Sequence, residues 1–213
     1  MAARKPHKPS VRTAPTDADP QSWLYLNPAG PSLAGTVFAV LRKAYAGRVN
    51  SALEFGYRKA NLGVVPAAAD FTVWSPNVER VEVLLPAGAD DHLVDPATLL
   101  AQMDRHAVDR EKALLIYLTL PLGDVDRVHL GWERARGFLR ERFARDRQLA
   151  SVLILHAPAT INAAFPLHAH ALIVPRKITG LGIRHGLYDE ELIYDGGQPI
   201  VEAMWADHVA RFR

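Results

Sequence analysis

The sequence contains no cysteine in its 213 residues. Disulfide bonds and structural metal sites built on cysteine, such as zinc fingers, are therefore excluded. The chain also lacks an apolar run long enough to span a bilayer, and its first residues lack the apolar core of a secretory signal. These two absences predict a cytoplasmic protein that has no membrane partner.

The chain also lacks a large excess of either positive or negative charge. The 25 lysines and arginines barely exceed the 23 acidic residues, which gives a formal net charge of +2. An excess this small does not by itself predict nucleic-acid binding, so any basic surface must come from local clustering. The sequence has no glycine-rich phosphate-binding loop and no internal repeat.

Hydrophobic residues make up 49% of the chain, which is typical of a globular protein. Residues 1–20 predict a flexible basic arm and residues 21–213 a single domain. Helices are predicted over about 32–47, 95–107, 125–146 and 199–212, and strands over 79–86, 113–119, 152–156 and 168–174. This order predicts an α+β fold: a single-layer, mainly antiparallel sheet with helices packed on one face and a histidine cluster on the other.

Three histidines near the end of the chain carry the strongest chemical signal. His168 and His170 alternate along one predicted strand, so their side chains point to the same face. His156 ends the preceding strand, and an antiparallel pairing of the two strands would bring all three imidazoles together. Three neutral imidazoles with open coordination positions form a divalent-metal site suited to catalysis.

Several segments resemble the MobA/MobL family of plasmid relaxases, which belongs to the His-hydrophobic-His endonucleases. The resemblance covers roughly residues 78–208, and the two histidine segments are its most specific part. The segments that carry it are Val81–Pro86, Ile116–Pro121, Leu155–Pro158, Pro166–Ala171, Arg176–Ile178 and Met204–His208.

The resemblance implies a metal-dependent enzyme that nicks single-stranded DNA at a transfer or replication origin during plasmid mobilisation. A tyrosine attacks the scissile phosphodiester, which leaves a 5′-phosphotyrosine and a free 3′-hydroxyl. It also implies that His156, His168 and His170 hold a divalent metal, most often manganese or magnesium, and that accessory mobilisation proteins are further partners.

Other site residues follow from the same comparison. The segment around Tyr45 is similar to the one that carries the family's nucleophile, although Tyr45 also fits a packed aromatic on the predicted helix 32–47. Glu82 is a candidate for orienting a histidine or acting as a base, with an ordinary exposed glutamate as the alternative. DNA contacts are predicted for Tyr57, Arg58, Lys59, Arg176 and Lys177.

Two other functions remain open from the sequence. A catalytically degenerate relaxase relative would bind DNA, or assist a partner, without cleaving it. A metal-dependent nucleotide phosphohydrolase would use the same histidines with water. A histidine-triad hydrolase fits less well, because Leu172 stands where that pattern needs a third alternating histidine.

Overall fold

The centre of the protein is a six-stranded sheet in the order β1-β2-β6-β8-β7-β5. The computed structural model describes residues 14–26, 35–109, 111–157, 166–183 and 187–212. All neighbouring strands of this sheet run antiparallel, so the predicted α+β fold with a mainly antiparallel sheet is confirmed. The strands are β1 (Tyr25–Leu26), β2 (Val37–Leu41), β5 (Arg80–Leu84), β6 (Leu115–Pro121), β7 (Leu149–His156) and β8 (His168–Lys177).

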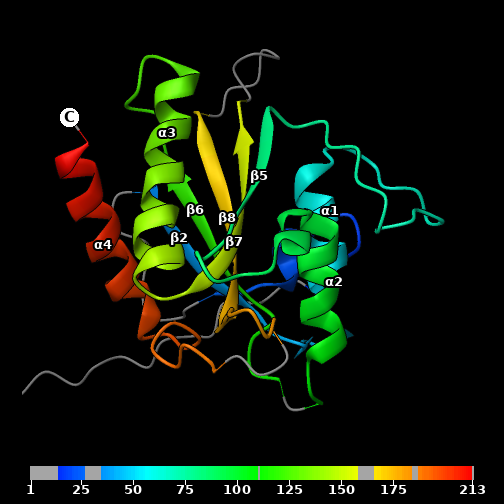
Figure 1. Cartoon of the computed structure of the whole chain (residues 1–213). Helices are drawn as coiled ribbons and strands as arrows, with labels where there is room; N and C mark the ends of the chain where they lie inside the picture. Colours follow the sequence, from blue (N-terminus) through cyan, green and yellow to red (C-terminus); the bar gives the residue numbers. More distant parts are fainter. Residues whose placement is uncertain (1–13, 27–34, 110, 158–165, 184–186, 213) are drawn as a thin grey trace, which may run out of the picture.

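Helices cover both faces of this sheet (Figure 1). On one face, α3 (Val128–Leu139), its continuation Arg140–Arg145 and α4 (Gly197–Arg211) bury one apolar core. On the other face, α1 (Ala52–Ala60) and α2 (Pro96–His106) bury a second. The histidine cluster lies opposite α3 and α4, as expected. The expectation that helices cover only one face is wrong, because α1 and α2 pack on the face that carries the histidines. Because both faces are covered, β7 and most of β8 are buried residue after residue rather than alternately.

The segment predicted as a helix over 32–47 contains a strand instead. Residues 32–34 lie outside the described residues, and Val37–Leu41 form β2, paired with β6 along its whole length. Phe38 packs in the core under α3 and α4, while Ala39 packs in the core under α1 and α2. An apolar run this short fits a helix face and a doubly buried strand equally well, which explains the error.

Helix α1 is fixed at its N-terminus by a carboxylate from α2. Asp104 accepts hydrogen bonds from the backbone N–H groups of Ala52 (2.7 Å) and Leu53 (3.0 Å) and from the Ser51 hydroxyl (2.6 Å). A negative charge at this end complements the helix dipole. The two helices are thereby locked together, with the last turn of α1 directed at the end of β7.

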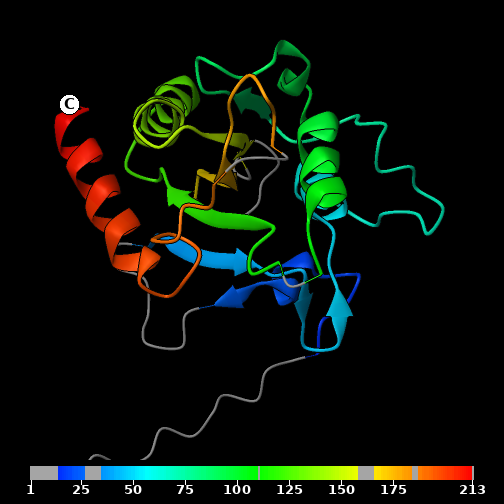
Figure 2. The same ribbon diagram turned by 60° about the horizontal axis from the view of Figure 1, so that its bottom comes forward.

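The N-terminal segment joins the fold before β1. Residues 1–13 of the predicted arm lie outside the described residues. The described remainder makes contacts with the domain: the Trp23 indole N–H donates to the Thr16 carbonyl oxygen (2.7 Å), and a short 3-10 turn follows at Pro20–Trp23. Figure 2 shows this segment beside the sheet edge formed by β1 and β2. Within the described residues, none of the helices has the length and apolar character needed to cross a membrane.

Candidate metal centre

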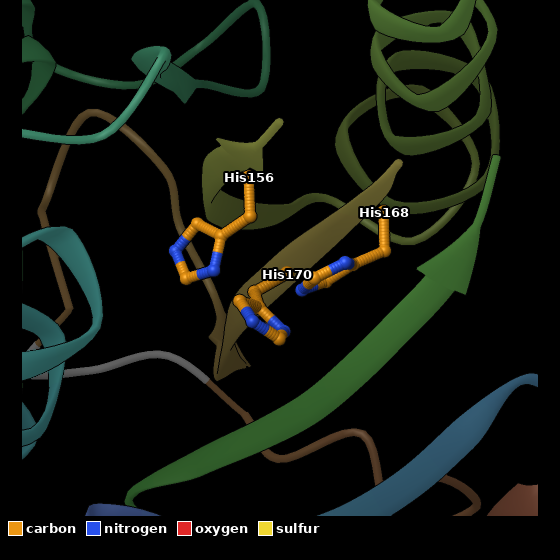
Figure 3. A group of neighbouring side chains, drawn as sticks. All are labelled: His156, His168 and His170. Atoms are coloured by element: carbon orange, nitrogen blue, oxygen red, sulfur yellow. The ribbon is translucent and has the colours of Figure 1, made fainter. Parts of the chain in front are cut away.

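The register between β7 and β8 brings the three histidines together. His156 lies directly opposite His168, and His170 lies opposite Ile154, two pairs further into the sheet. Because residues opposite each other in an antiparallel pair share a face, all three imidazoles project to the same side. One ring nitrogen from each lies within 4.8 Å of the others, and Figure 3 shows the rings facing a common point. The predicted convergence is confirmed.

Hydrogen bonds to two backbone carbonyls fix the tautomers of the outer two rings. His156 Nε2 donates to the carbonyl oxygen of Lys59 (3.0 Å), in the last turn of α1. His168 Nδ1 donates to the carbonyl oxygen of Pro166 (2.9 Å). Since a carbonyl can only accept, the other nitrogen of each neutral ring keeps its lone pair. His156 therefore offers Nδ1 to a metal, and His168 offers Nε2.

A buried network of hydrogen-bonded side chains fixes the orientation of the third ring, that of His170. The Tyr117 hydroxyl donates to Gln21 Oε1 (3.2 Å), so its oxygen accepts from His170 Nδ1 (2.8 Å). Thr119 Oγ1 lies 3.2 Å from the same nitrogen, and Lys59 Nζ donates to the same Gln21 oxygen (2.7 Å). His170 is left with the lone pair of Nε2. An N–H committed to a second partner is the usual arrangement of a metal-binding histidine.

Burial keeps these groups in the protonation states that metal binding needs. Desolvation lowers the pKa of His156 to about 4 and holds the pKa of His170 well below its ordinary value. Both rings are therefore neutral at pH 7, and protons compete little with a metal. Desolvation also raises the pKa of the Tyr117 hydroxyl, which stays protonated, and lowers that of the Lys59 ammonium to about 8.

The donor set fits a divalent cation. In the described part of the chain, no carboxylate is grouped with the three rings. Three neutral ligands leave the full positive charge of the ion in place, and three ligands also leave coordination positions open. A divalent ion held there would polarise a carbonyl or phosphoryl oxygen of a substrate. The trio is thus a candidate site for a divalent metal, and three ligands would leave coordination positions open.

The predicted nucleophile Tyr45 lies elsewhere. It belongs to the small hairpin of β3 (Ala44–Tyr45) and β4 (Arg48–Val49), beyond the Leu41 end of β2. His170, in contrast, is level with Val37 at the opposite end of β2, through its pairing with Thr119. The ring of Tyr45 packs edge-on against Tyr25, with centroids 5.8 Å apart. Because residues 37–41 form a strand and not a helix, Tyr45 is carried away from the histidines.

Glu82 is placed on the wrong face for its predicted role. It lies opposite Leu153, whose side chain belongs to the core under α3. Both oxygens of Glu82 accept from Arg136 Nε on α3, each at 2.9 Å. The expectation that Glu82 shares the histidine face is therefore wrong, and its role in the fold is an ion pair to α3.

Of the residues predicted to contact DNA, two lie at the far end of β8. Arg176 is buried, and its guanidinium pairs with the buried Glu111 carboxylate at 2.8 Å. Lys177 follows it, nine residues after His168, which corresponds to about 30 Å along an extended strand. In the sequence, two adjacent basic residues resemble a phosphate-binding element. In the structure, the charge of Arg176 is paired with Glu111, and Lys177 lies too far from the histidines to contact the same phosphate.

The other three predicted DNA-contacting residues lie on α1. Tyr57, Arg58 and Lys59 occupy the last turns of α1, whose final carbonyls meet His156. The Tyr57 ring packs edge-on against Phe71 and Trp74 from the connection that follows α1, with centroids 5.3 and 6.2 Å away. Arg58 and Lys59 line the same cavity as His156, whereas the ring contacts of Tyr57 are with the connection that follows α1.

Comparison with known proteins gives support at the level of the fold. No protein-family model matches the sequence, and no curated protein matches it either. One similar solved structure comes from work on the molecular basis of vancomycin resistance transfer in Staphylococcus aureus. It superposes with a TM-score of 0.51 at 18% identity, over 64% of this chain and 70% of that one. At this identity the similarity establishes a shared fold.

Proposed function

We propose that this protein is a metal-dependent, relaxase-like enzyme that binds single-stranded DNA at a transfer or replication origin and cleaves one strand at the histidine centre. The observation that carries the proposal is the convergence of three imidazoles, each oriented by a hydrogen bond through one of its ring nitrogens. The fold similarity to a protein of antibiotic-resistance transfer is consistent with a role in plasmid mobilisation. A cytoplasmic location and accessory mobilisation proteins belong to the same proposal.

The residues of the histidine centre would have two roles, holding the metal ion and orienting its ligands. His156, His168 and His170 would hold the ion, and Tyr117 with Gln21 orients the innermost ring. A bound divalent ion supplies charge neutralisation for a non-bridging oxygen of the scissile phosphodiester. Manganese and magnesium are the metals implied by the relaxase resemblance, and imidazole ligands favour manganese over magnesium.

A tyrosyl–DNA intermediate is the finer part of this proposal. The tyrosine oxygen would bond to phosphorus while the phosphorus–O3′ bond breaks, and the proton would end on the released 3′-hydroxyl. Tyr117 does not supply this oxygen, because its side chain is fully buried and its hydroxyl is occupied by His170 and Gln21. Tyr57 lies two residues before Lys59 on α1 and is the residue we test first.

The second candidate function is DNA binding without cleavage, as in an accessory module. One observation favours it: the tyrosine that the fold brings into contact with the trio is the buried Tyr117. A metal centre without a nucleophile would still bind a phosphodiester and hold a strand in place.

One experiment separates these functions. The purified protein is incubated with manganese and labelled single-stranded oligonucleotides that tile the DNA around its gene, and products are resolved on denaturing gels. A covalent adduct that is lost in Tyr57→Phe and in His168→Ala supports the relaxase. Bound but uncut DNA supports the accessory module, and release of a free 5′-phosphate supports hydrolysis by water. Equal cleavage by His168→Ala contradicts all roles for the trio.

A further inference from the structure

A cavity of about 630 Å³ opens beside the metal centre. His156 lines it on one side, and the last turn of α1 lines it on another. Its remaining walls come from residues 17–20 of the N-terminal segment and from residues 61–67, just after α1. A ligand held by the histidines would therefore extend directly into this space.

The outer wall of the cavity belongs to an unusually long connection. Residues 61–79 join α1 to β5 without forming a helix or strand, and they project from the body of the protein (Figures 1 and 2). Connections of this length that lack secondary structure are usually either functional loops or flexible linkers. Two of its apolar side chains line the cavity and remain exposed: Leu62 at 47% and Val64 at 99%. Exposed apolar side chains beside a polar centre suggest a surface that a ligand covers.

The connection 61–79 has a fixed backbone at Leu62, although its side chains there are exposed. Leu62 donates its backbone N–H to Asn77 Oδ1 (2.6 Å), and its carbonyl oxygen accepts from Asn77 Nδ2 (2.9 Å). Further along, the Trp74 indole N–H donates to the Phe71 carbonyl oxygen (2.9 Å). The connection therefore presents its apolar side chains from a fixed backbone, as a binding site requires.

The charges of the cavity select against a phosphate. Arg58 is neutralised by Glu54 at 2.9 Å, and the Lys59 side chain is buried away from the opening. Asp17, whose carboxylate pairs with Arg48, and the exposed Asp19 also line the cavity. A cavity whose arginine is paired, whose lysine is buried and whose walls are partly apolar suits an uncharged group with an apolar face, such as a nucleobase, better than an anion.

We propose that this cavity binds an unpaired nucleobase of the substrate strand, the one next to the phosphate held at the histidine centre. The inference rests on the proposed function, since the phosphate at the trio is what brings the base to the cavity. One sugar separates a phosphate from its base, and His156 belongs both to the trio and to the cavity wall. Leu62 and Val64 supply the surface on which the base packs.

The test compares ligands with and without a base. Binding of deoxyribose 5-phosphate and of the 3′- and 5′-deoxynucleoside monophosphates to manganese-loaded protein is measured by isothermal titration calorimetry. Removal of about 50 Å² of apolar surface from water, when a base packs on Leu62 and Val64, improves affinity by about tenfold. We expect that gain for at least one isomer in the wild type. We expect most of it to be lost in Leu62→Asn/Val64→Asn, which leaves the charge unchanged, with deoxyribose phosphate binding retained.

The control is Val73→Asn, on the same connection, 65% exposed and outside the cavity lining. This variant keeps the full gain from the base. If deoxyribose phosphate binds but the base adds nothing, or if the gain survives in Leu62→Asn/Val64→Asn, the cavity proposal is wrong and the metal centre stands. If deoxyribose phosphate itself fails to bind, the proposed function is wrong and the cavity proposal falls with it.

Discussion

Replacing Tyr117 by phenylalanine tests how much the buried hydrogen bonds that orient His170 contribute to metal affinity. The substitution removes only the hydroxyl that accepts from His170 Nδ1 at 2.8 Å, and the ring shape is kept in a fully buried position. Loss of an outer-shell partner lowers metal affinity by about 10- to 100-fold. Thr119 Oγ1, at 3.2 Å from the same nitrogen, remains as a poorer partner. We therefore expect a loss near the lower end, about tenfold or roughly 1.4 kcal/mol.

The assay is a competition titration of the metal-free protein with zinc and manganese against a chromophoric chelator at pH 7.5. Tyr117→Phe/Thr119→Val should lose about 100-fold, because neither hydroxyl oxygen remains for the Nδ1 proton. Tyr188→Phe is the matched control: its hydroxyl, 3.5 Å from the Ala113 carbonyl oxygen, is remote from the trio. The reasoning would be refuted if Tyr117→Phe shows a cooperative thermal unfolding transition and yet binds the metal with an unchanged dissociation constant.

Three further outcomes follow from the same contacts. The pKa of His156 is about 4 in the folded protein and about 6.5 in an unfolded chain, so the unfolded state binds more protons between these values. The metal-free protein should therefore lose about 2 kcal/mol of unfolding free energy or more between pH 7 and pH 4.5, measured by urea titration, because the lowered pKa of His170 acts in the same direction. Glu82→Gln breaks a partly exposed ion pair with Arg136 and should lower the free energy of unfolding by about 0.5–1 kcal/mol without changing metal affinity. A large loss of metal binding in this variant would show that Glu82 does act at the histidine centre. Glu111→Gln leaves the Arg176 guanidinium buried without its partner charge and should cost about 3 kcal/mol in the same titration, whereas a change below 1 kcal/mol would show that Arg176 reaches solvent.

The part of the centre that sequence predicts is the part fixed by local rules. Alternation places His168 and His170 on one face, and antiparallel pairing of adjacent strands adds His156. The start of α2 follows in the same way: Asp95 caps it by accepting from the Thr98 N–H (2.7 Å), with Pro96 at its first position. Each of these features depends on residues near one another in the chain.

The features that sequence missed depend on distant partners. Gln21 and Tyr117 are 96 residues apart, and nothing local indicates that their side chains meet at His170. The polar Thr119 two residues after Tyr117 in an apolar strand is a weak signal of a polar face, but it does not identify the partner. The strand Val37–Leu41 was misassigned because its neighbour β6 lies more than 70 residues away. The prediction of Tyr45 as the nucleophile rests on the resemblance of its segment, and local sequence does not show that the hairpin of β3 and β4 carries it beyond the Leu41 end of β2.

The central claim is that His156, His168 and His170 bind one divalent ion together. The most direct measurement is the stoichiometry and affinity of manganese and zinc for the metal-free chain, followed by the same titration of His168→Ala. His168 is the most exposed of the three, so its replacement disturbs the fold least. One ion per chain in the wild type, with at least tenfold weaker binding in His168→Ala, is the predicted result. No binding by the wild type, or equal affinity in the variant, would contradict it.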